Sequence, residues 1–157
     1  MRLLLIIIFL PNLLYANIAI DQLNRSLEQK KIISVKTTST RLKDLSQNYY
    51  LVFIYKSTCP HCHNFAPVLL DFTKTFAVEM KAYSLDQQSL AGLKAQTLSP
   101  ELFKTFYSGY RPVVPALFLV NKHTLQAYAL LFGEATPVQL SSRVDSVLTR
   151  IEGNFNA

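Results

Sequence analysis

The sequence is poor in cysteine, glycine and charged residues. It has 157 residues, of which only 2 are cysteine, 4 are glycine and 7 are proline, and 17% are charged. The scarcity of glycine and proline excludes a collagen-like or low-complexity chain, and two cysteines cannot form a disulfide scaffold. Hydrophobic residues make up 50% of the chain, which is enough to bury a core and excludes wholesale disorder. The length suits one domain with a small extension.

Positive charge is in excess but is not concentrated. Lys and Arg number 16 against 10 Asp and Glu, and the formal net charge is +6. The basic residues stand singly, with Lys30-Lys31 as the only adjacent pair. Because a nucleic-acid site needs a basic patch or stripe, nucleic acid is not expected as a partner.

The N-terminus has the features of a secretory signal peptide. Arg2 precedes an apolar run over residues 3–10, and Ala16 is a small residue at a cleavable position. We expect residues 1–16 to be removed, with Ala19 as the second choice of site and a retained membrane anchor as the alternative. The apolar run makes about 12 Å of helix, well short of a bilayer core of about 30 Å. The rest of the chain would then face a non-cytoplasmic compartment, where disulfides persist.

Residues 17–47 form a candidate N-terminal extension. Apolar side chains three and four residues apart predict a short amphipathic helix over residues 20–31. Residues 32–35 are a candidate short strand. The polar residues 41–48 have room for one helical turn.

The candidate domain, residues 48–153, alternates strand and helix patterns. Tyr49–Tyr55 is short, aromatic and apolar on both faces, which is typical of a central strand. Apolar residues then recur at helical spacing from Phe65 to Phe76, with Pro67 inside the helix, where it should cause a kink. The remaining expected elements are a strand within 78–86, a loop over 87–98, a helix from Ser99 to about Tyr107 that Gly109 stops, strands over 113–120 and 125–132, and a closing helix from Thr136 to near Gly153.

This order predicts an α/β fold with a mixed central sheet flanked by helices. A parallel pair comes from the first strand–helix–strand unit, and the last two strands form an antiparallel hairpin. Thr136 and Gln139 have the spacing of a capping box, with Pro137 at the first helical position. Residues 154–157 are left as a tail.

Both cysteines lie in the stretch Cys59-Pro60-His61-Cys62, where the central strand passes into the helix. Unsatisfied N–H groups and the helix dipole favour an anion at a helix start, and such sites lower a cysteine pKa from about 8.5 to about 3.5–7.5. Cys62, one turn later, can close a disulfide ring with Cys59 and should be the more buried, second-acting thiol. Pro60 would stiffen the ring, and a charged His61 would favour the Cys59 thiolate. The pattern predicts dithiol–disulfide exchange, with the cysteine pair as the redox group and no other cofactor.

Three other roles for the cysteines stay open. A structural disulfide over so short a loop would stabilise the fold little. The pattern Cys-x-x-Cys-His, ending at His63, also matches c-type haem attachment, for which Met80 is a sixth ligand by type. The strand that leads directly into the motif argues against haem. Zinc needs four ligands, and beyond the cysteines only His61, His63 and His123 are available among histidines.

Val114-Pro115 is the second feature that bears on a site. A proline inside a strand removes a hydrogen-bond donor from the sheet. It is tolerated at the start of a strand, where we expect a cis bond facing the cysteines, and a trans proline on an edge strand is the alternative. An extended substrate would bind beside Val114 and Pro115 through its backbone.

These features resemble the thioredoxin superfamily over residues 48–151. The tetrapeptide from Cys59 to Cys62 looks like the active-site motif of the DsbA type, and Pro67 sits where thioredoxins kink their active-site helix. Pro115 matches the cis-proline of the family, and Gly133 matches the glycine that ends its last strand. The resemblance implies a thioredoxin-like fold.

A narrower resemblance is to the TrbB family of periplasmic thiol–disulfide isomerases of F-type conjugative pilus assembly. It covers the stretch from Cys59 to Leu69 and recurs, in the same order, in residues 83–86, 118–121, 124–125 and 143–148. The resemblance implies an enzyme with Cys59 as the attacking thiol, Cys62 as the resolving thiol and Pro115 on the substrate side.

The same resemblance implies a periplasmic isomerase or oxidase whose substrates are cysteine-containing proteins of a conjugative transfer system. A thiol reductase fed by a membrane electron donor and a redox-silent assembly chaperone are the alternatives, and a monomer is expected by default. The sequence departs from many thioredoxins in the strand before the cysteines, and residues 20–47 match nothing in that superfamily. Many thioredoxins carry a buried acid six residues before the first cysteine, where this chain has Phe53. A proton from Cys62 would therefore pass to water, to His61 or to another group.

Overall fold

The computed structural model describes the chain in five stretches: residues 20–30, 40–42, 45–90, 92–108 and 110–155. The chain divides into two compact units, Met1–Ser39 and Thr40–Ala157, and each is described by itself.

In the first unit, residues 20–30 are helical, which confirms the predicted amphipathic helix. The expected signal peptide and the candidate strand at residues 32–35 lie outside the described residues. Among the residues that are described, no helix combines the length and the apolar character needed to cross a bilayer.

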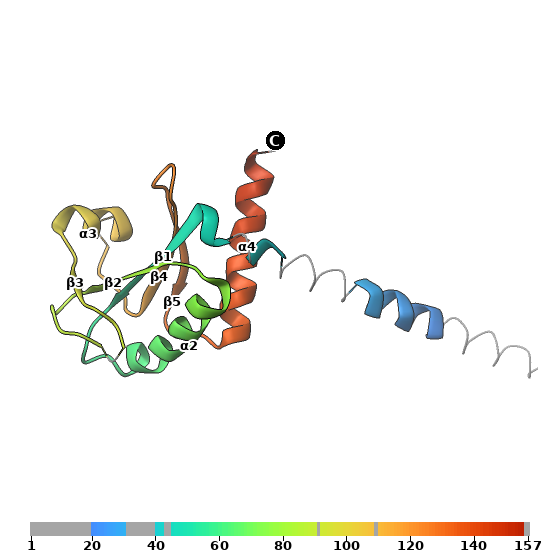
Figure 1. The fold of residues 1–157 in the computed structure, drawn as a ribbon, viewed down its shortest axis with the longest axis horizontal. Helices are drawn as coiled ribbons and strands as arrows, with labels where there is room; N and C mark the ends of the chain where they lie inside the picture. Colours follow the sequence, from blue (N-terminus) through green and yellow to red (C-terminus); the bar gives the residue numbers. More distant parts are fainter. Residues whose placement is uncertain (1–19, 31–39, 43–44, 91, 109, 156–157) are drawn as a thin grey trace, which may run out of the picture. The chain divides into compact units, whose positions relative to one another are not determined.

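The second unit is built on a five-stranded mixed sheet with strand order β3-β2-β1-β4-β5 (Figure 1). β1 pairs in parallel with β2, and β2 with β3, whereas β1–β4 and β4–β5 are antiparallel. The predicted α/β fold with a mixed sheet is therefore confirmed. The elements are β1 (Tyr49–Tyr55), α2 (Pro60–Phe76), β2 (Met80–Ser84), β3 (Gln96–Thr97), α3 (Pro100–Tyr107), β4 (Ala116–Asn121), β5 (Ala127–Phe132) and α4 (Pro137–Phe155).

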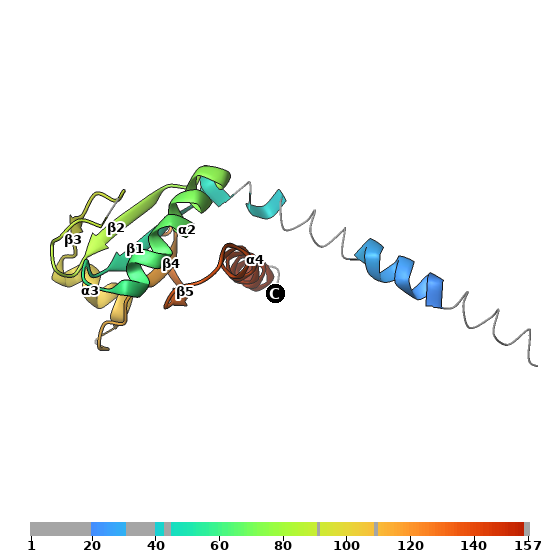
Figure 2. The same cartoon turned by 90° about the horizontal axis from the view of Figure 1, so that it is seen from below.

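Helices cover both faces of the sheet, and β1 is buried between them. Leu51, Phe53 and Tyr55 share one core with the apolar side chains of α2 and α4. Val52 and Ile54 share the second core with Tyr107 of α3. Figure 1 shows α3 above the strands and α2 below them, and Figure 2 views the same arrangement from the α2 side. Because side chains alternate along a strand, a strand buried on both faces must be apolar throughout, which is the pattern that predicted β1.

The first core extends beyond the predicted domain. Leu42 and Leu45 are buried in it, at 2% and 1% exposure. The described residues 40–42 and 45–48 are helical, which agrees with the helical turn expected in this stretch. The compact unit begins at Thr40, so both leucines belong to it, although the predicted domain begins at residue 48.

Several element ends differ from the prediction. β3 lies in the expected loop, and it escaped prediction because both of its side chains are exposed and carry no apolar pattern. β4 begins only at Ala116, after Pro115, since proline cannot donate to the sheet. α4 runs through Gly153 to Phe155, into the expected tail. α3 ends at Tyr107 as predicted, but its left-handed C-cap is Ser108.

The capping box at the start of α4 is confirmed in both directions. The Thr136 N–H donates to Gln139 Oε1 at 2.9 Å, and the Gln139 N–H donates to Thr136 Oγ1 at 3.3 Å. Two donors at the helix start are satisfied by this exchange.

The burial of Leu45 makes the extent of the domain testable. Leu45→Ala should lower the free energy of unfolding by about 2–5 kcal/mol, because it leaves a cavity in the first core. Leu125→Ala is the matched control, since Leu125 is 68% exposed and should change stability by no more than about 0.5 kcal/mol. Urea titrations of the two variants measure the difference. Equal, small effects would show that residues 40–48 do not belong to the core.

Candidate active site

The two cysteines lie at the start of α2, as predicted, with unequal exposure. Cys59 is the N-cap of the helix, in an extended conformation with φ −87° and ψ 115°. Its carbonyl accepts the N–H groups of Cys62 at 3.0 Å and His63 at 3.2 Å. Both cysteines are free thiols, Cys59 half-buried and Cys62 fully buried. Cys59 is thus the accessible thiol at the positive end of the helix.

The environment of Cys62 favours the protonated thiol. Burial raises the pKa of Cys62 to about 12, and neighbouring Cys59 and Asp86 act in the same direction. A hydrogen bond to the backbone of Lys56 opposes the rise only in part. Phe53, at the position where many thioredoxins have an acid, is itself fully buried. Cys62 is therefore a poor nucleophile at neutral pH until its proton is removed.

The Val114–Pro115 peptide bond is cis, as predicted, and lies against Cys59. The Cys59 thiol points at the Val114 carbonyl, with Sγ and O 3.9 Å apart. Pro115 is held from the other side, because its carbonyl accepts the N–H of Gly133 at 2.8 Å. Gly133 has φ +107°, a conformation that favours glycine, directly after β5. The structure thus brings Cys59, Cys62, Val114 and Pro115 together, from two separate parts of the chain.

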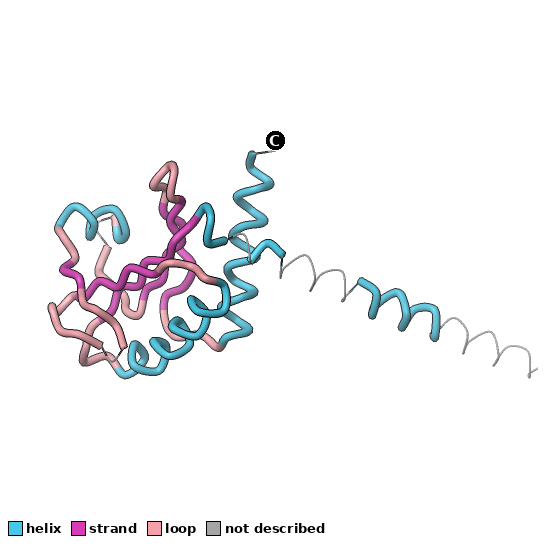
Figure 3. The backbone as a smooth tube through the Cα atoms, in the orientation of Figure 1, coloured by secondary structure: helices cyan, strands magenta, loops and turns pink. Residues whose placement is uncertain are grey.

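The register of the sheet explains this meeting. Ile54 of β1 pairs with Ala116 of β4, so the residues just before Ala116 lie next to the end of β1. The loops that follow the parallel strands β1 and β2 gather at the same end of the sheet (Figure 3). Catalytic residues on loops held by a rigid sheet are a common arrangement.

His61 has a partner that the sequence did not reveal. Its Nδ1 lies 3.2 Å from Oε1 of Glu134, just after Gly133. Hydrogen bonds from Asn64 and then from His61 hold the pKa of Glu134 below its usual value. Glu134 thus joins the start of α2 to the segment after β5. The predicted influence of His61 on the Cys59 thiolate stays a prediction.

The other histidines have partners of their own. His63 Nε2 is 2.6 Å from the Ser57 carbonyl oxygen. His123 lies in the turn after β4, and its Nε2 is 3.3 Å from Asn48 Oδ1. Within the described part of the chain, no three His, Cys, Asp or Glu side chains come together as a metal site would require.

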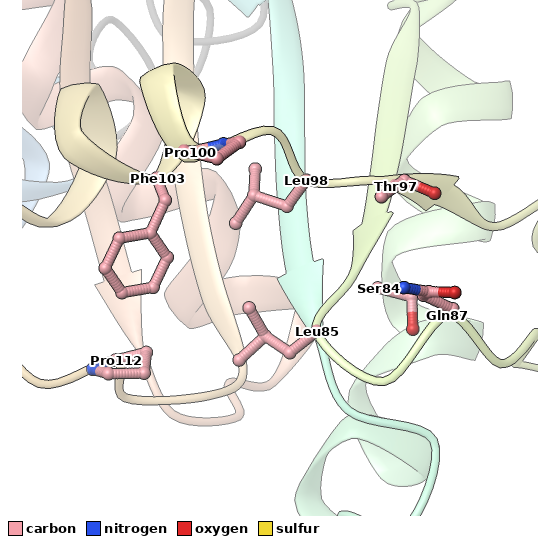
Figure 4. Close-up of a pocket in the computed structure, with 8 residues that line it drawn as sticks. All are labelled: Ser84, Leu85, Gln87, Thr97, Leu98, Pro100, Phe103 and Pro112. Carbon is pink, nitrogen blue, oxygen red and sulfur yellow. The ribbon is translucent and has the colours of Figure 1, made fainter.

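A pocket of about 490 Å³ lies at the carboxyl end of β2, next to α3 (Figure 4). Figure 4 shows its apolar side chains on the α3 side and its polar ones toward β2 and β3. None of the lining residues has a titratable side chain. They are Ser84, Leu85, Gln87, Thr97, Leu98, Pro100, Phe103 and Pro112.

A second pocket, of about 290 Å³, adjoins the cis-proline loop. Its most exposed apolar side chains are Tyr110, Val113 and Phe132, at 78%, 53% and 55% exposure, and we call these three residues the Tyr110 surface. Val113 directly precedes Val114. The Val113 carbonyl accepts a hydrogen bond from the Tyr107 hydroxyl at 3.1 Å. The apolar surface is therefore continuous with the loop that faces Cys59.

A solved structure resembles the fold of this chain. A solved thiol:disulfide interchange protein of the thioredoxin family, from Chlorobium tepidum TLS, superimposes with a TM-score of 0.51 over 66% of this chain and 81% of its own. The identity is 17%, so the likeness shows the fold. The chain therefore has a thioredoxin-like fold, as the resemblance implied.

The sequence comparisons are more specific. Protein TrbB of Escherichia coli K12 is 32% identical over 111 residues, which are 70% of this chain. The chain covers 61% of TrbB, less than two thirds of that relative. The family model described as TraF, F plasmid transfer operon protein, matches residues 7–144. This match spans most of the chain, including the cysteines, the cis-proline loop and the start of α4, and the chain belongs to the TraF family.

Proposed function

We propose that this protein catalyses thiol–disulfide exchange on protein substrates through Cys59 and Cys62, as an isomerase or oxidase. One observation carries the proposal. The accessible Cys59 thiol stands at the N-terminus of α2, 3.9 Å from the Val114 carbonyl, with the buried Cys62 one turn later. An activated thiolate, a resolving thiol and an adjoining backbone for substrate are the parts that this chemistry needs.

The proposed substrates are cysteine-containing proteins of a conjugative transfer system. The proposal rests on the family, which is named for the transfer operon of the F plasmid, and on the likeness to TrbB. We place the activity in the periplasm, on the strength of the apolar N-terminal run in residues 3–10. The cysteine pair would be the redox group, with no further cofactor.

The exchange proceeds in two steps. The Cys59 thiolate attacks one sulfur of a substrate disulfide, the substrate S–S bond breaks, and the other substrate sulfur leaves as a thiolate. A second substrate thiolate can then attack the mixed disulfide and release Cys59, which reshuffles the substrate without net oxidation. Alternatively, Cys62 attacks Cys59 Sγ, which oxidises the pair and reduces the substrate. The reverse of this path transfers a disulfide from the oxidised pair to a substrate dithiol.

The state of Cys62 favours reshuffling over reduction. With its pKa raised to about 12 by burial, Cys62 is almost wholly protonated at neutral pH. A protonated resolving thiol attacks slowly, so the mixed disulfide lasts longer and substrate thiols have time to attack it. The periplasmic reductase, supplied by a membrane thiol donor, is the alternative that this argument disfavours.

The two cysteines should fail in different ways when replaced. Cys59→Ser should abolish isomerase, oxidase and reductase activity, because the attacking sulfur is gone. Cys62→Ser should instead accumulate covalent mixed disulfides with substrate, seen as reducible high-mass species on non-reducing gels. Each variant is the control for the other, since both remove one thiol. Full turnover in reductase assays with Cys62→Ser would contradict the two-thiol scheme.

The reduction potential of the pair separates the redox roles. We expect a value between about −120 and −200 mV, in the range of DsbA and protein disulfide isomerase. Alkylation and mass spectrometry after equilibration in glutathione buffers measure it. A value near −270 mV, as in thioredoxin, would support the reductase instead. A pair that does not titrate would rule out exchange altogether.

The Tyr110 surface is where the polypeptide beside the substrate disulfide would bind. Tyr110→Ala should raise KM for a folded protein disulfide several-fold and leave the rate with a small disulfide unchanged, because only the polypeptide reaches past Val114. Val138→Ala is the control, at 79% exposure on α4. Equal KM values in both variants would place the substrate elsewhere.

The same exposed apolar residues favour a second candidate function, an assembly chaperone without redox turnover. The double variant Cys59→Ser, Cys62→Ser separates the two. If it still prevents aggregation of a reduced, unfolded client as well as the wild type does, binding alone accounts for the function.

A further inference from the structure

One carboxylate holds the loop between β1 and α2. Asp86, just after β2, accepts hydrogen bonds from the Ser57 N–H at 3.0 Å, from Ser57 Oγ at 2.7 Å and from Ser84 Oγ at 2.7 Å. A further hydrogen bond to Asp86 comes from the backbone of Gln88. Asp86 therefore fastens Ser57 to the end of β2, beside the active site.

The loop that Asp86 holds also positions both thiols. The carbonyl of Lys56, next to Ser57, accepts the N–H of Cys59 at 3.1 Å, and the Lys56 backbone also hydrogen-bonds to the Cys62 thiol. The Ser57 carbonyl meets His63 Nε2 at 2.6 Å, one residue past Cys62. Any movement of residues 56–57 would therefore displace the contacts of the two cysteines together.

Asp86 is charged throughout the working range of pH. The hydrogen bonds from Ser84 and Ser57 hold the pKa of its carboxyl far below the usual value. It is therefore a poor proton acceptor and does not substitute for the acid that Phe53 replaces. Its charge does act on Cys62, where it adds to the effect of burial in raising the pKa of that thiol.

The other titratable groups in this electrostatic network are Cys59, Tyr55 and Tyr107. Cys59 interacts with Cys62, Tyr55 with Asp86, and Tyr107 with Cys62. Burial raises the pKa of Tyr55 and of Tyr107, so both phenols stay neutral near pH 7. Asp86 is therefore the charged carboxylate of this network near pH 7.

We propose that Asp86 is a positioning residue for the thiol pair, which fixes the Lys56–Ser57 segment and sets a permanent negative charge near the resolving Cys62. The inference rests on the proposed function, because it concerns how slowly Cys62 closes the disulfide with Cys59. Asp86 has no hydrogen bond to either reacting sulfur. It acts through its hydrogen bonds to Ser57 and through the electrostatic effect of its charge on Cys62.

The closing step can be timed on the reduced protein with 5,5′-dithiobis(2-nitrobenzoate), which releases the coloured thionitrobenzoate anion. The Cys59 thiolate attacks one sulfur of the reagent and breaks its S–S bond. One thionitrobenzoate anion is released, and the other half of the reagent stays bonded to Cys59 Sγ as a mixed disulfide. The Cys62 thiolate then attacks Cys59 Sγ, forms the Cys59–Cys62 disulfide and releases the second anion. Stopped-flow absorbance gives the rate constant of the second release.

Asp86→Asn removes the charge and keeps an acceptor oxygen for Ser57. It should speed the second release at pH 7, by about three- to fourfold for each unit by which the Cys62 pKa falls. A tenfold gain in thiolate per unit is partly offset by lower nucleophilicity, which follows a Brønsted slope of about 0.4–0.5. A merely structural role for Asp86 would slow the release, so the sign of the change is diagnostic.

Asp86→Ala removes the acceptor as well. Its second release should be slower than that of Asp86→Asn, although the two variants carry the same charge. If Asp86→Ala does not fold, Ser57→Ala tests the positioning in its place. It keeps the carboxylate and loses one hydrogen bond, so it should slow the release without changing its dependence on pH.

Asp71→Asn is the matched control, because it removes one exposed acid from α2 and changes the net charge equally. The proposal is overturned if Asp86→Asn releases no faster than the wild type, or if Asp71→Asn accelerates it as much. Failure of the proposed function looks different. A wild-type protein that releases only one anion, or none, lacks the exchanging pair itself.

Discussion

The burial of β1 on both faces is the constraint on which the site depends. Alternate side chains of this strand fill two cores, so β1 cannot shift along its neighbours without exposing apolar surface. Its end is therefore fixed, and α2 must begin close to it. The antiparallel register with β4 then sets Val114 and Pro115 beside that end. The approach of Cys59 Sγ to the Val114 carbonyl follows from the packing of a strand that contains neither residue.

The two thiols differ in burial because they occupy different positions in the first turn of α2. Cys59, as N-cap, stands at the edge of the core with the backbone N–H groups of the first turn nearby. One turn later the chain faces inward, and Cys62 joins the first core at 0% exposure. Taking a thiolate out of water costs free energy, so burial alone keeps Cys62 protonated. With Phe53 at the position of the usual acid, nothing on β1 offers to take that proton.

The sequence was sufficient to predict those parts of the fold that depend on interactions between residues close together in the chain. The apolar run of β1, the proline at the start of β4 and the capping box at Thr136 each have a mechanism within a few residues. The parts that sequence reasoning missed depend on distant partners. β3 has no apolar pattern of its own. Leu42 and Leu45 stand in a polar stretch, and their burial can be recognised only from the core into which they pack. Asp86 and Glu134 are ordinary polar residues in the sequence, and only the fold brings them to Ser57 and His61.

The redox character of the pair therefore belongs to the fold around the tetrapeptide as much as to the tetrapeptide. Pro60 and His61 are part of the motif, but the groups that hold them or act on Cys62 come from outside it. Glu134 follows β5, Asp86 follows β2, and the Lys56 carbonyl follows β1. A relative with the same four residues and other loops would keep the attacking thiol, since the helix start alone provides it. Under the proposed function, it would not keep the same balance between reshuffling and reduction, because that balance depends on how readily Cys62 loses its proton.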